Sequence, residues 1–150
     1  MGKDTLIRRA LKALPDFERA ITATTRPRRP GERAGVSYYF VSAAQFEGKK
    51  SKDELLEWAT VHGYMYGTPK KSVDEIIAAG KNVILAVDVQ GALTIKKKMR
   101  EAVLIFVAPP SLEELERRLR RRKTEDKKEI TARIEAAKKE IELSSLYDYV

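Results

Sequence analysis

The sequence predicts an α/β fold in which a parallel sheet carries helices on both faces. Two continuous apolar runs rich in β-branched residues, 82–87 and 102–108, have the composition of strands buried on both sides. Segments with helical periodicity lie before, between and after them, and strands that alternate with helices indicate a parallel sheet. Shorter alternating strands between about 30 and 68 predict a small β-rich insert.

The first half of the chain is predicted to begin with a helix and continue with short strands. Ile7, Leu11 and Leu14 follow helical spacing, which predicts an amphipathic helix over 5–14 that ends before Pro15. We expect strands at 17–24, 36–41, 55–62 and 65–66, the last two forming a pair around Gly63.

Helices are expected to dominate the second half. Ser72 with Glu75 three residues later is a capping-box pattern, which predicts a helix that ends at Gly80. Ser111 with Glu114 opens a further helix in the same way. We also expect a helix over 91–100, an apolar stripe of Leu112, Leu115 and Leu119, and a last long helix marked by Ile130, Ile134, Ala137 and Ile141.

The composition limits the classes of protein that fit. A length of 150 residues allows one domain with a core of its own, and the lack of cysteine excludes disulfides and thiolate metal sites. The single histidine, His62, is expected to be structural. No apolar run approaches the ~20 residues of a membrane span and no signal peptide precedes the first helix, so we expect a cytoplasmic protein with no membrane partner.

The charge indicates an anionic partner. The net charge is +8 and the isoelectric point is near 9.7. Basic residues are spread over several predicted helices, and the dense basic run at 117–123 has no interleaved aromatic residues for stacking on bases. A nucleotide with several phosphates therefore explains the charge better than a nucleic acid.

Residues 24–32 read TTRPRRPGE and are the most informative segment. Pro27 and Pro30 stiffen the backbone that carries Arg26 and Arg29. Two guanidinium forks at a fixed spacing suit a phosphate dianion, because each offers planar, permanently charged donors.

With Tyr38, EW at 57–58, YGTP at 66–69 and DVQG at 88–91, this run resembles the guanylate kinases over essentially the whole chain. The resemblance implies a transferase of purine nucleotide metabolism that moves the ATP γ-phosphoryl group to GMP, giving GDP and ADP. It implies a P-loop nucleoside-monophosphate-kinase-like sheet in one domain. Its expected parts are a core at 1–29 and 69–117, a GMP-binding insert at 30–68, a helical lid at about 118–135 and a final core helix at 136–150.

The resemblance also implies how GMP is bound. A buried carboxylate can accept the N1–H and N2–H donors of guanine while a hydroxyl donates to O6, which would exclude AMP. Glu57 and Thr68 would read guanine in this way, with Thr22 and Asp88 nearby. The GMP phosphate would be held by Arg26, Arg29, Tyr38 and Tyr66.

On the ATP side, the resemblance places Gly2 and Lys3 at the end of a phosphate-binding loop. The residues implied to bind ATP are Gly2, Lys3, Asp4 and Thr5, with Asp4 or Thr5 on Mg²⁺. The implied catalytic residues are Lys3, which would bridge the β- and γ-phosphates, and the lid arginines Arg118, Arg122 and Arg133.

The chain departs from the family pattern in three places. Asp4 stands where a P-loop usually has Ser or Thr, and Ala86 stands where many members have a second acidic residue. Arg121 and Lys123 replace lid glycines, which is expected to stiffen the lid. We expect the rest of the P-loop with its strand upstream of Met1, and a further strand and helix after Val150, so that GMP-dependent ATP turnover by these 150 residues alone would be negligible.

Two alternatives from other classes stay open. One is a catalytically impaired guanylate-kinase-like module that binds nucleotides or peptides; the complete Arg, Tyr, Glu and Thr set disfavours it. The other is a kinase for a phosphorylated sugar, which would have no guanine for Glu57 and Thr68 to read. A monomer and a homodimer are both compatible with the sequence.

Overall fold

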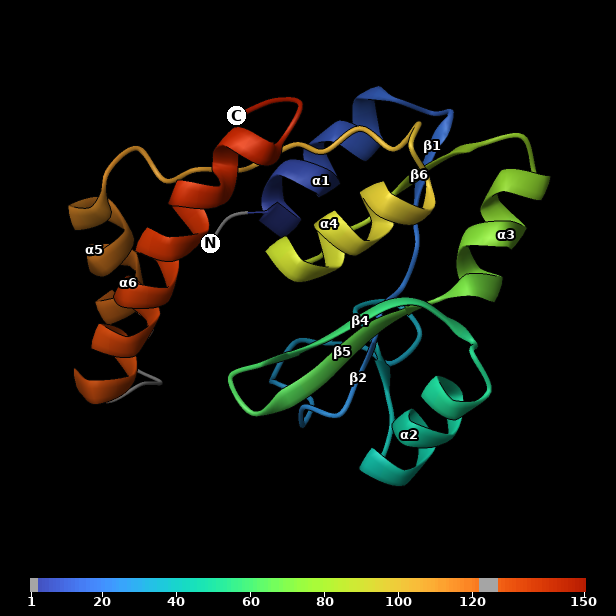
Figure 1. Cartoon of the computed structure of the whole chain (residues 1–150), viewed down its shortest axis with the longest axis horizontal. Coiled ribbons are helices and arrows are strands. Elements are labelled where there is room, and N and C mark those ends of the chain that lie inside the picture. Colours follow the sequence, from blue (N-terminus) through green and yellow to red (C-terminus); the bar gives the residue numbers. More distant parts are fainter. Residues whose placement is uncertain (1–2, 122–126) are drawn as a thin grey trace. The chain divides into compact units, whose positions relative to one another are not determined.

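The computed structural model of the chain describes residues 3–121 and 127–150 (Figure 1). The chain divides into two compact units, a larger one of Asp4–Arg100 and a smaller one of Glu101–Val150 together with Met1–Lys3. Among the described residues, no helix combines the length and the apolar character needed to cross a membrane.

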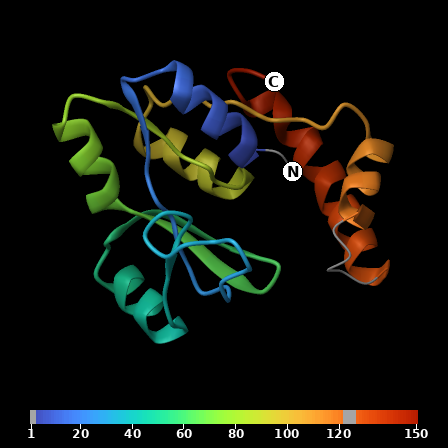
Figure 2. The same cartoon turned by 180° about the vertical axis from the view of Figure 1, so that it is seen from behind.

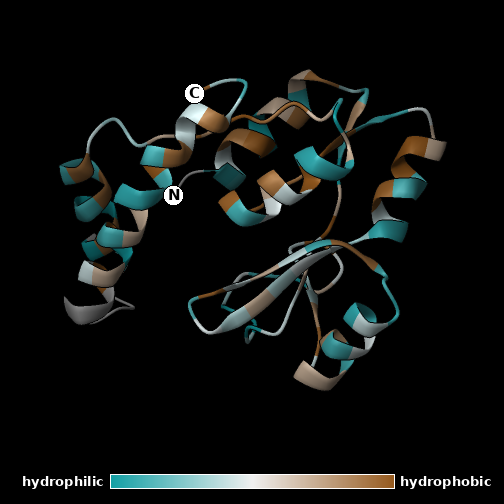
Figure 3. Cartoon of the chain, in the orientation of Figure 1, coloured by the Kyte–Doolittle hydropathy of each residue, from teal (hydrophilic) through white to brown (hydrophobic). Residues whose placement is uncertain are grey.

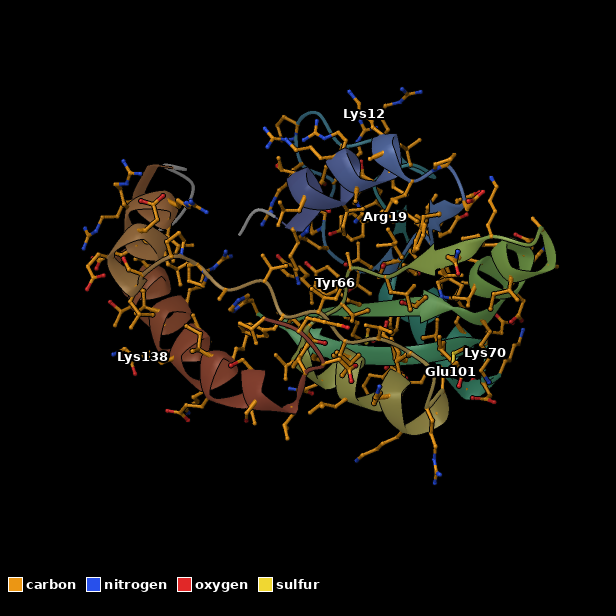
Figure 4. The ribbon with its side chains drawn as sticks, turned by 90° about the horizontal axis from the view of Figure 1, so that it is seen from above. Lys12, Arg19, Tyr66, Lys70, Glu101 and Lys138 are labelled. Carbon is orange, nitrogen blue, oxygen red and sulfur yellow. The ribbon has the colours of Figure 1, made fainter. Side chains whose placement is uncertain are left out.

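Two sheets and their covering helices make up the larger unit. The elements up to residue 100 are α1 (Lys3–Ala13), β1 (Phe17–Arg19), β2 (Ala23–Thr24), β3 (Tyr39–Phe40), α2 (Ala43–Ser51), β4 (Leu55–Val61), β5 (Tyr64–Pro69), α3 (Lys70–Ala78), β6 (Asn82–Ile84) and α4 (Val89–Lys98). Strands β1 and β6 pair in parallel, and the second sheet has the order β3-β2-β5-β4. Seen from above, α1 and α4 lie on opposite sides of the strands (Figure 4). The predicted α/β class with helices on both faces is confirmed.

The predicted strand over 17–24 is divided between the two sheets. Its first part, β1, pairs with β6, and the last bond of that pairing runs from Ala20 N to Ile84 O over 3.1 Å. Two residues later the chain has changed partner, because Tyr39 N donates to Thr22 O at 2.9 Å. The predicted strand over 82–87 is likewise shorter and ends at Ile84, since β6 pairs with β1 alone among the described strands.

Small apolar clusters hold these layers together. Ala20, Val73 and Ile76 are buried and join α3 to the parallel strands. In the second sheet, the fully buried Phe46 of α2 packs with Ala23 and Leu55. Figure 2 shows the loop that follows β2 (light blue) lying over the β4–β5 hairpin, which its hydrogen bonds confirm, such as that from Thr25 N to Met65 O at 3.1 Å.

The β4–β5 hairpin turns at the predicted place. Val61 pairs with Tyr64, so the loop has two residues, and both His62 (φ 49°) and Gly63 (φ 80°) are left-handed. Two positive φ angles define the type I′ turn, which matches the twist of the flanking strands. His62 is thus a turn residue, which agrees with the structural role expected for it.

The capping box predicted at Ser72 is wrong. Helix α3 begins two residues earlier, at Lys70, and its N-cap residue Pro69 makes no side-chain capping bond. Strand β5 ends at Pro69 and α3 begins at the next residue, Lys70. Lys70 N still donates to Glu54 O, next to β4, at 2.9 Å, so the strand pairing continues up to the first residue of the helix. The predicted end at Gly80 is confirmed, since Gly80 is left-handed (φ 73°) and its N–H donates to Ile77 O at 2.9 Å.

The described residues of the smaller unit form two helices and a short 3₁₀ turn. They are α5 (Leu112–Arg121), α6 (Lys127–Glu142) and η1 (Leu143–Leu146). Leu115, Leu119 and Ile130 are buried between the two helices, as the apolar stripes predict. Hydrophilic and hydrophobic stretches alternate along both helices in Figure 3. Ser111 caps α5 as predicted, because its Oγ accepts a hydrogen bond from Glu114 N at 3.2 Å.

The buried strand predicted over 102–108 is absent from this unit. The segment forms one isolated bridge, Ile105 to Tyr149, and Val103 and Ile105 are 61% and 65% exposed. Backbone bonds join it to 148–149, for example from Phe106 N to Tyr149 O at 2.7 Å. A β-branched run predicts a buried strand only where neighbouring strands pair with it, and no second strand does so in the described part of this unit.

The predicted domain boundaries stay predictions. Strand β2, assigned from the sequence to the core, pairs here with β3 and β5 of the insert. The boundary proposed between 135 and 136 falls inside the continuous helix α6.

We expect Phe46→Ala to destabilise the larger unit by about 3–5 kcal/mol, because Phe46 is fully buried and the substitution leaves a cavity. Urea unfolding can be followed through the fluorescence of Trp58, the single tryptophan, which lies on β4 of the same sheet. As a control, Ile77→Ala removes a side chain that is 49% exposed and is expected to change stability by under about 1 kcal/mol. Equal losses in both variants would contradict the core position of Phe46.

Candidate functional site

Buried polar side chains gather in the larger unit where β2, β4 and β5 meet. Such groups are unfavourable in an apolar interior unless hydrogen bonds satisfy them, so a cluster of them indicates a site. The buried ones among the described residues are Thr22, Thr24, Arg26, Glu57 and Thr68. Four of the five were predicted as site residues; Thr24 was not.

Glu57 and Thr68 form the centre of this cluster. They lie opposite each other on the antiparallel strands β4 and β5, beside a register shift between Leu55 and Glu57. Thr68 Oγ1 donates to Glu57 Oε1 at 2.6 Å, and the Glu57 side chain is only 3% exposed. Burial raises the pKa of Glu57; the hydrogen bond from Thr68 opposes this shift and the negative charge of Asp88 adds to it.

The first turn of α4 lies close to the Glu57 carboxylate. Asp88 caps the helix, its Oδ1 accepting a hydrogen bond from Gly91 N at 2.9 Å. A Cβ atom at position 91 would lie 2.6 Å from Glu57 Oε2 and 3.1 Å from Asp88 Oδ1. Only glycine therefore fits at this position while both carboxylates keep their places. Gly91 was missed as a site residue, although it closes the DVQG motif.

Arg26 lies after β2 with its side chain 7% exposed. Its guanidinium donates to three oxygens: Glu32 Oε1 at 2.6 Å, Pro27 O at 2.7 Å and Tyr66 Oη at 3.2 Å. Burial alone would lower the pKa of Arg26, but the hydrogen bonds to Glu32 and Tyr66 outweigh it and raise the pKa. The side chain is therefore a fixed cation. Glu32, like Thr24 and Gly91, is a site residue that the sequence prediction did not assign.

Two tyrosine side chains, Tyr38 and Tyr66, lie beside the Arg26 guanidinium group. The centre of the Tyr38 ring lies 5.4 Å from the Arg26 guanidinium carbon, within range of a cation–π interaction. Tyr38 and Tyr66 pack edge to face with ring centres 6.1 Å apart, and Tyr66 is labelled in Figure 4. Burial raises the pKa of Tyr38, so its hydroxyl stays protonated and can donate.

Threonines fasten the Arg26 segment to β5. Thr24 Oγ1 donates to Met65 O at 3.0 Å and accepts from Arg26 N at 3.1 Å. Thr25 Oγ1 accepts from Met65 N at 3.0 Å. Because these bonds join both residues before Arg26 to Met65, the backbone of Arg26 has little freedom relative to Tyr66, the next residue of β5.

Arg29, also predicted in this site, has an exposed side chain. Its backbone N–H donates to Glu32 Oε2 at 2.8 Å. The structure thus brings together Arg26, Tyr38 and Tyr66, and it brings together Glu57, Thr68 and Asp88. Thr22 is buried beside β2, and its carbonyl oxygen accepts a hydrogen bond from Tyr39 N. Arg29 lies on the same loop as Arg26, with its guanidinium toward solvent.

The remaining predicted residues lie at the start of α1 and in the smaller unit. Lys3 is the first residue of α1, and Asp4 Oδ1 pairs with Arg19 Nη1 at 2.8 Å. Arg118 Nε donates to Glu114 Oε1 at 2.6 Å on α5, and Arg133 lies on α6. Gly2 and Arg122 lie outside the described residues. The described residues contain no group of three or more His, Asp or Glu that could hold a metal.

The geometry of the larger unit suits a ligand with two different ends. A buried carboxylate paired with a hydroxyl can accept adjacent N–H donors and donate to a nearby carbonyl oxygen. A fixed guanidinium beside two tyrosine hydroxyls can bind an anionic oxygen group. Tyr66 and Thr68 are two residues apart on β5, so one strand contributes to both ends.

Comparisons of the sequence and of the fold with known proteins lead to the same family. The family model described as guanylate kinase matches residues 1–150. Curated guanylate kinases of Myxococcus xanthus, Desulfitobacterium hafniense and Thermotoga maritima are 49%, 45% and 42% identical over 99% of this chain, which covers 72%, 74% and 72% of their lengths. The crystal structure of guanylate kinase from Anaplasma phagocytophilum matches with a TM-score of 0.78 and 38% identity, over 94% of this chain and 69% of that one.

The raised pKa of Glu57 predicts how stability depends on pH. Below its ordinary value of 4.5 the carboxyl is neutral in both the folded and the unfolded chain; as pH rises through the higher folded value, ionisation favours the unfolded chain. We therefore expect Glu57→Gln to be more stable than the parent chain at neutral pH, with the difference vanishing near pH 4. Urea midpoints from Trp58 fluorescence across this range test it, and a difference independent of pH would contradict it.

Proposed function

The chain belongs to the guanylate kinase family, and we propose that it transfers the γ-phosphoryl group of ATP to GMP, giving ADP and GDP. The family model over the whole chain and relatives at 42–49% identity support this activity. They confirm the resemblance seen in the sequence motifs. No observation favours the peptide-binding module or the sugar-phosphate kinase.

The observation that carries the proposal is the buried Glu57–Thr68 pair beside Asp88 and Gly91. Guanine presents N1–H and N2–H donors next to its O6 acceptor. The Glu57 carboxylate would accept the two donors, and the Thr68 hydroxyl would turn to donate to O6. Adenine has an acceptor at N1 and no hydrogen there. With adenine bound, the buried Glu57 carboxylate would therefore face another acceptor and lack a hydrogen-bond donor.

Arg26 and Arg29 would hold the GMP phosphate, with Tyr38 and Tyr66 as neutral donors. Support comes from the cation fixed on Arg26 and from the hydroxyl of Tyr66 within hydrogen-bond distance of it. Tyrosine hydroxyls add donors without adding charge. The two arginines would therefore supply the charged donors to the phosphate, and the tyrosines would bond further oxygens of it. Thr22, buried next to β2, would line the same site.

The reaction needs alignment and charge neutralisation but no general base. An oxygen of the GMP phosphate, already anionic, attacks the γ-phosphorus of ATP, and the bond from that phosphorus to the β,γ-bridging oxygen breaks. Lys3 with Arg118, Arg122 and Arg133 would neutralise the charge on the transferred group. Closure of a lid over it would keep water from competing with GMP.

Magnesium is the metal that the family implies. Mg²⁺ takes oxygen ligands and is usually bound through one or two protein oxygens, water and substrate phosphates. Asp4 and Thr5 in the first turn of α1 offer oxygens of this kind, although Asp4 also pairs with Arg19 at 2.8 Å. We assign Asp4 or Thr5 to this ion, which would shield the negative charge of the ATP phosphates. A cytoplasmic location and a monomeric or homodimeric state complete the proposal.

Calorimetry should show GMP binding and much weaker AMP binding by the chain. Glu57→Gln should weaken GMP strongly and reduce the preference over AMP, because the amide directs N–H donors at guanine donors. Equal affinities for GMP and AMP in the parent chain would contradict the guanine assignment.

Arg29→Ala should weaken GMP by roughly 2–4 kcal/mol while leaving guanosine binding nearly unchanged, since the lost contact is to phosphate. Arg28→Ala is a matched control, an exposed arginine one residue away with no assigned role, and should change GMP affinity little. Equal loss of GMP and guanosine binding in Arg29→Ala would show that Arg29 is structural.

A further inference from the structure

A tight turn carries Glu32 back toward the two arginines. Residues 29–32 are closed by a hydrogen bond from Glu32 N to Arg29 O at 3.1 Å. Pro30 occupies the second position and Gly31 the third, with φ 83°. Proline followed by a left-handed glycine is the pattern of a type II turn, so Pro30 and Gly31 together determine where Glu32 lies.

The carboxylate of Glu32 joins both arginines. Its Oε1 accepts from Arg26 Nη2 at 2.6 Å, and its Oε2 accepts from the backbone N–H of Arg29 at 2.8 Å. The side chains of Arg26 and Glu32 are 7% and 20% exposed, so this pair is largely shielded from water. Exposed ion pairs add little rigidity, whereas a shielded one with short hydrogen bonds holds its partners in place.

The bonds of Arg26 leave part of its guanidinium for a ligand. Glu32, Pro27 O and Tyr66 Oη take one N–H group each from Nη2, Nη1 and Nε. Of the five N–H groups of an arginine, one on each Nη atom is then without a partner among the described residues. Three bonds to different partners fix the plane of the fork, and the two remaining N–H donors are available to an anionic ligand.

We propose that Glu32 is a positioning residue for the GMP phosphate, which holds the Arg26 fork and the Arg29 backbone as one pre-set pair. The inference rests on the proposed function. Fixing Arg26 before the ligand arrives removes the entropic penalty of ordering a long side chain on binding. Glu32 touches arginine and not substrate, so it acts only through these residues.

A different role for Glu32 would be to occupy Arg26 until phosphate displaces it. Its second oxygen argues against this, because displacement would also break the bond to Arg29 N and strain the turn that carries it. The two roles predict opposite results: a displaced carboxylate competes with GMP, so its removal would tighten GMP binding.

The test is calorimetry of the whole chain with GMP and guanosine. Glu32→Gln should weaken GMP by roughly tenfold to a hundredfold, since an amide cannot accept from both partners, and should change guanosine affinity by less than about twofold. Gly31→Ala, which strains the turn at φ 83° without touching a charge, should also weaken GMP selectively. Glu18→Gln is the control: this exposed carboxylate pairs with Lys81 away from the site and should alter neither ligand.

A double-mutant cycle separates positioning from general destabilisation. In an Arg26→Lys background the fork is already lost, so Glu32→Gln should weaken GMP by less than about threefold further. Tighter GMP binding by Glu32→Gln, equal loss of GMP and guanosine, or an undiminished effect in the Arg26→Lys background would each overturn the role of Glu32. If the parent chain itself fails to prefer GMP over AMP, the proposed function falls instead, independently of Glu32.

Discussion

The burial of one carboxylate, that of Glu57, constrains much of the larger unit. A carboxylate that is only 3% exposed needs hydrogen-bond partners. The strand and the helix that lie next to Glu57 are placed so that such contacts can form. The register of β4 and β5 places the Thr68 hydroxyl opposite it. The absence of a side chain at Gly91 lets the first turn of α4 approach its second oxygen. A shift in strand register or in the start of α4 would therefore act on the same group.

At the other end of the site the buried charge is a cation, Arg26, and it is stabilised differently from the Glu57 carboxylate. Glu57 is held beside a hydroxyl and a second carboxylate, whereas Arg26 has its own counter-ion in Glu32 at 2.6 Å. Burial therefore raises the pKa of Glu57, while the pairing lowers the pKa of Glu32 against its own burial. Strand β5 links the two ends, because Tyr66 and Thr68 point to the same face of it.

The sequence predicts the helices well and the strands less well, for a physical reason. Helical periodicity is local, so α1, α5 and α6 are found where their apolar stripes lie. A strand depends on partners far along the chain, which is why the apolar run at 102–108 forms an isolated bridge and no strand among the described residues. The site residues with family motifs could be named from sequence. Glu32 and Gly91 could not, because their roles depend on a turn and on a close approach that appear only in three dimensions.

The polar groups of the site indicate the chemistry of the ligand that it would bind. Thr68 gives Glu57 a single hydrogen bond from a side chain, while an ionised carboxylate has room for about four. Guanine would add the two donors that lower the energy of the buried charge, and adenine would not. Arg26 in turn retains two N–H donors beyond those bonded to the described residues. In the proposed function, base selectivity and phosphate affinity would thus have one origin, because GMP would add hydrogen bonds to both buried charges.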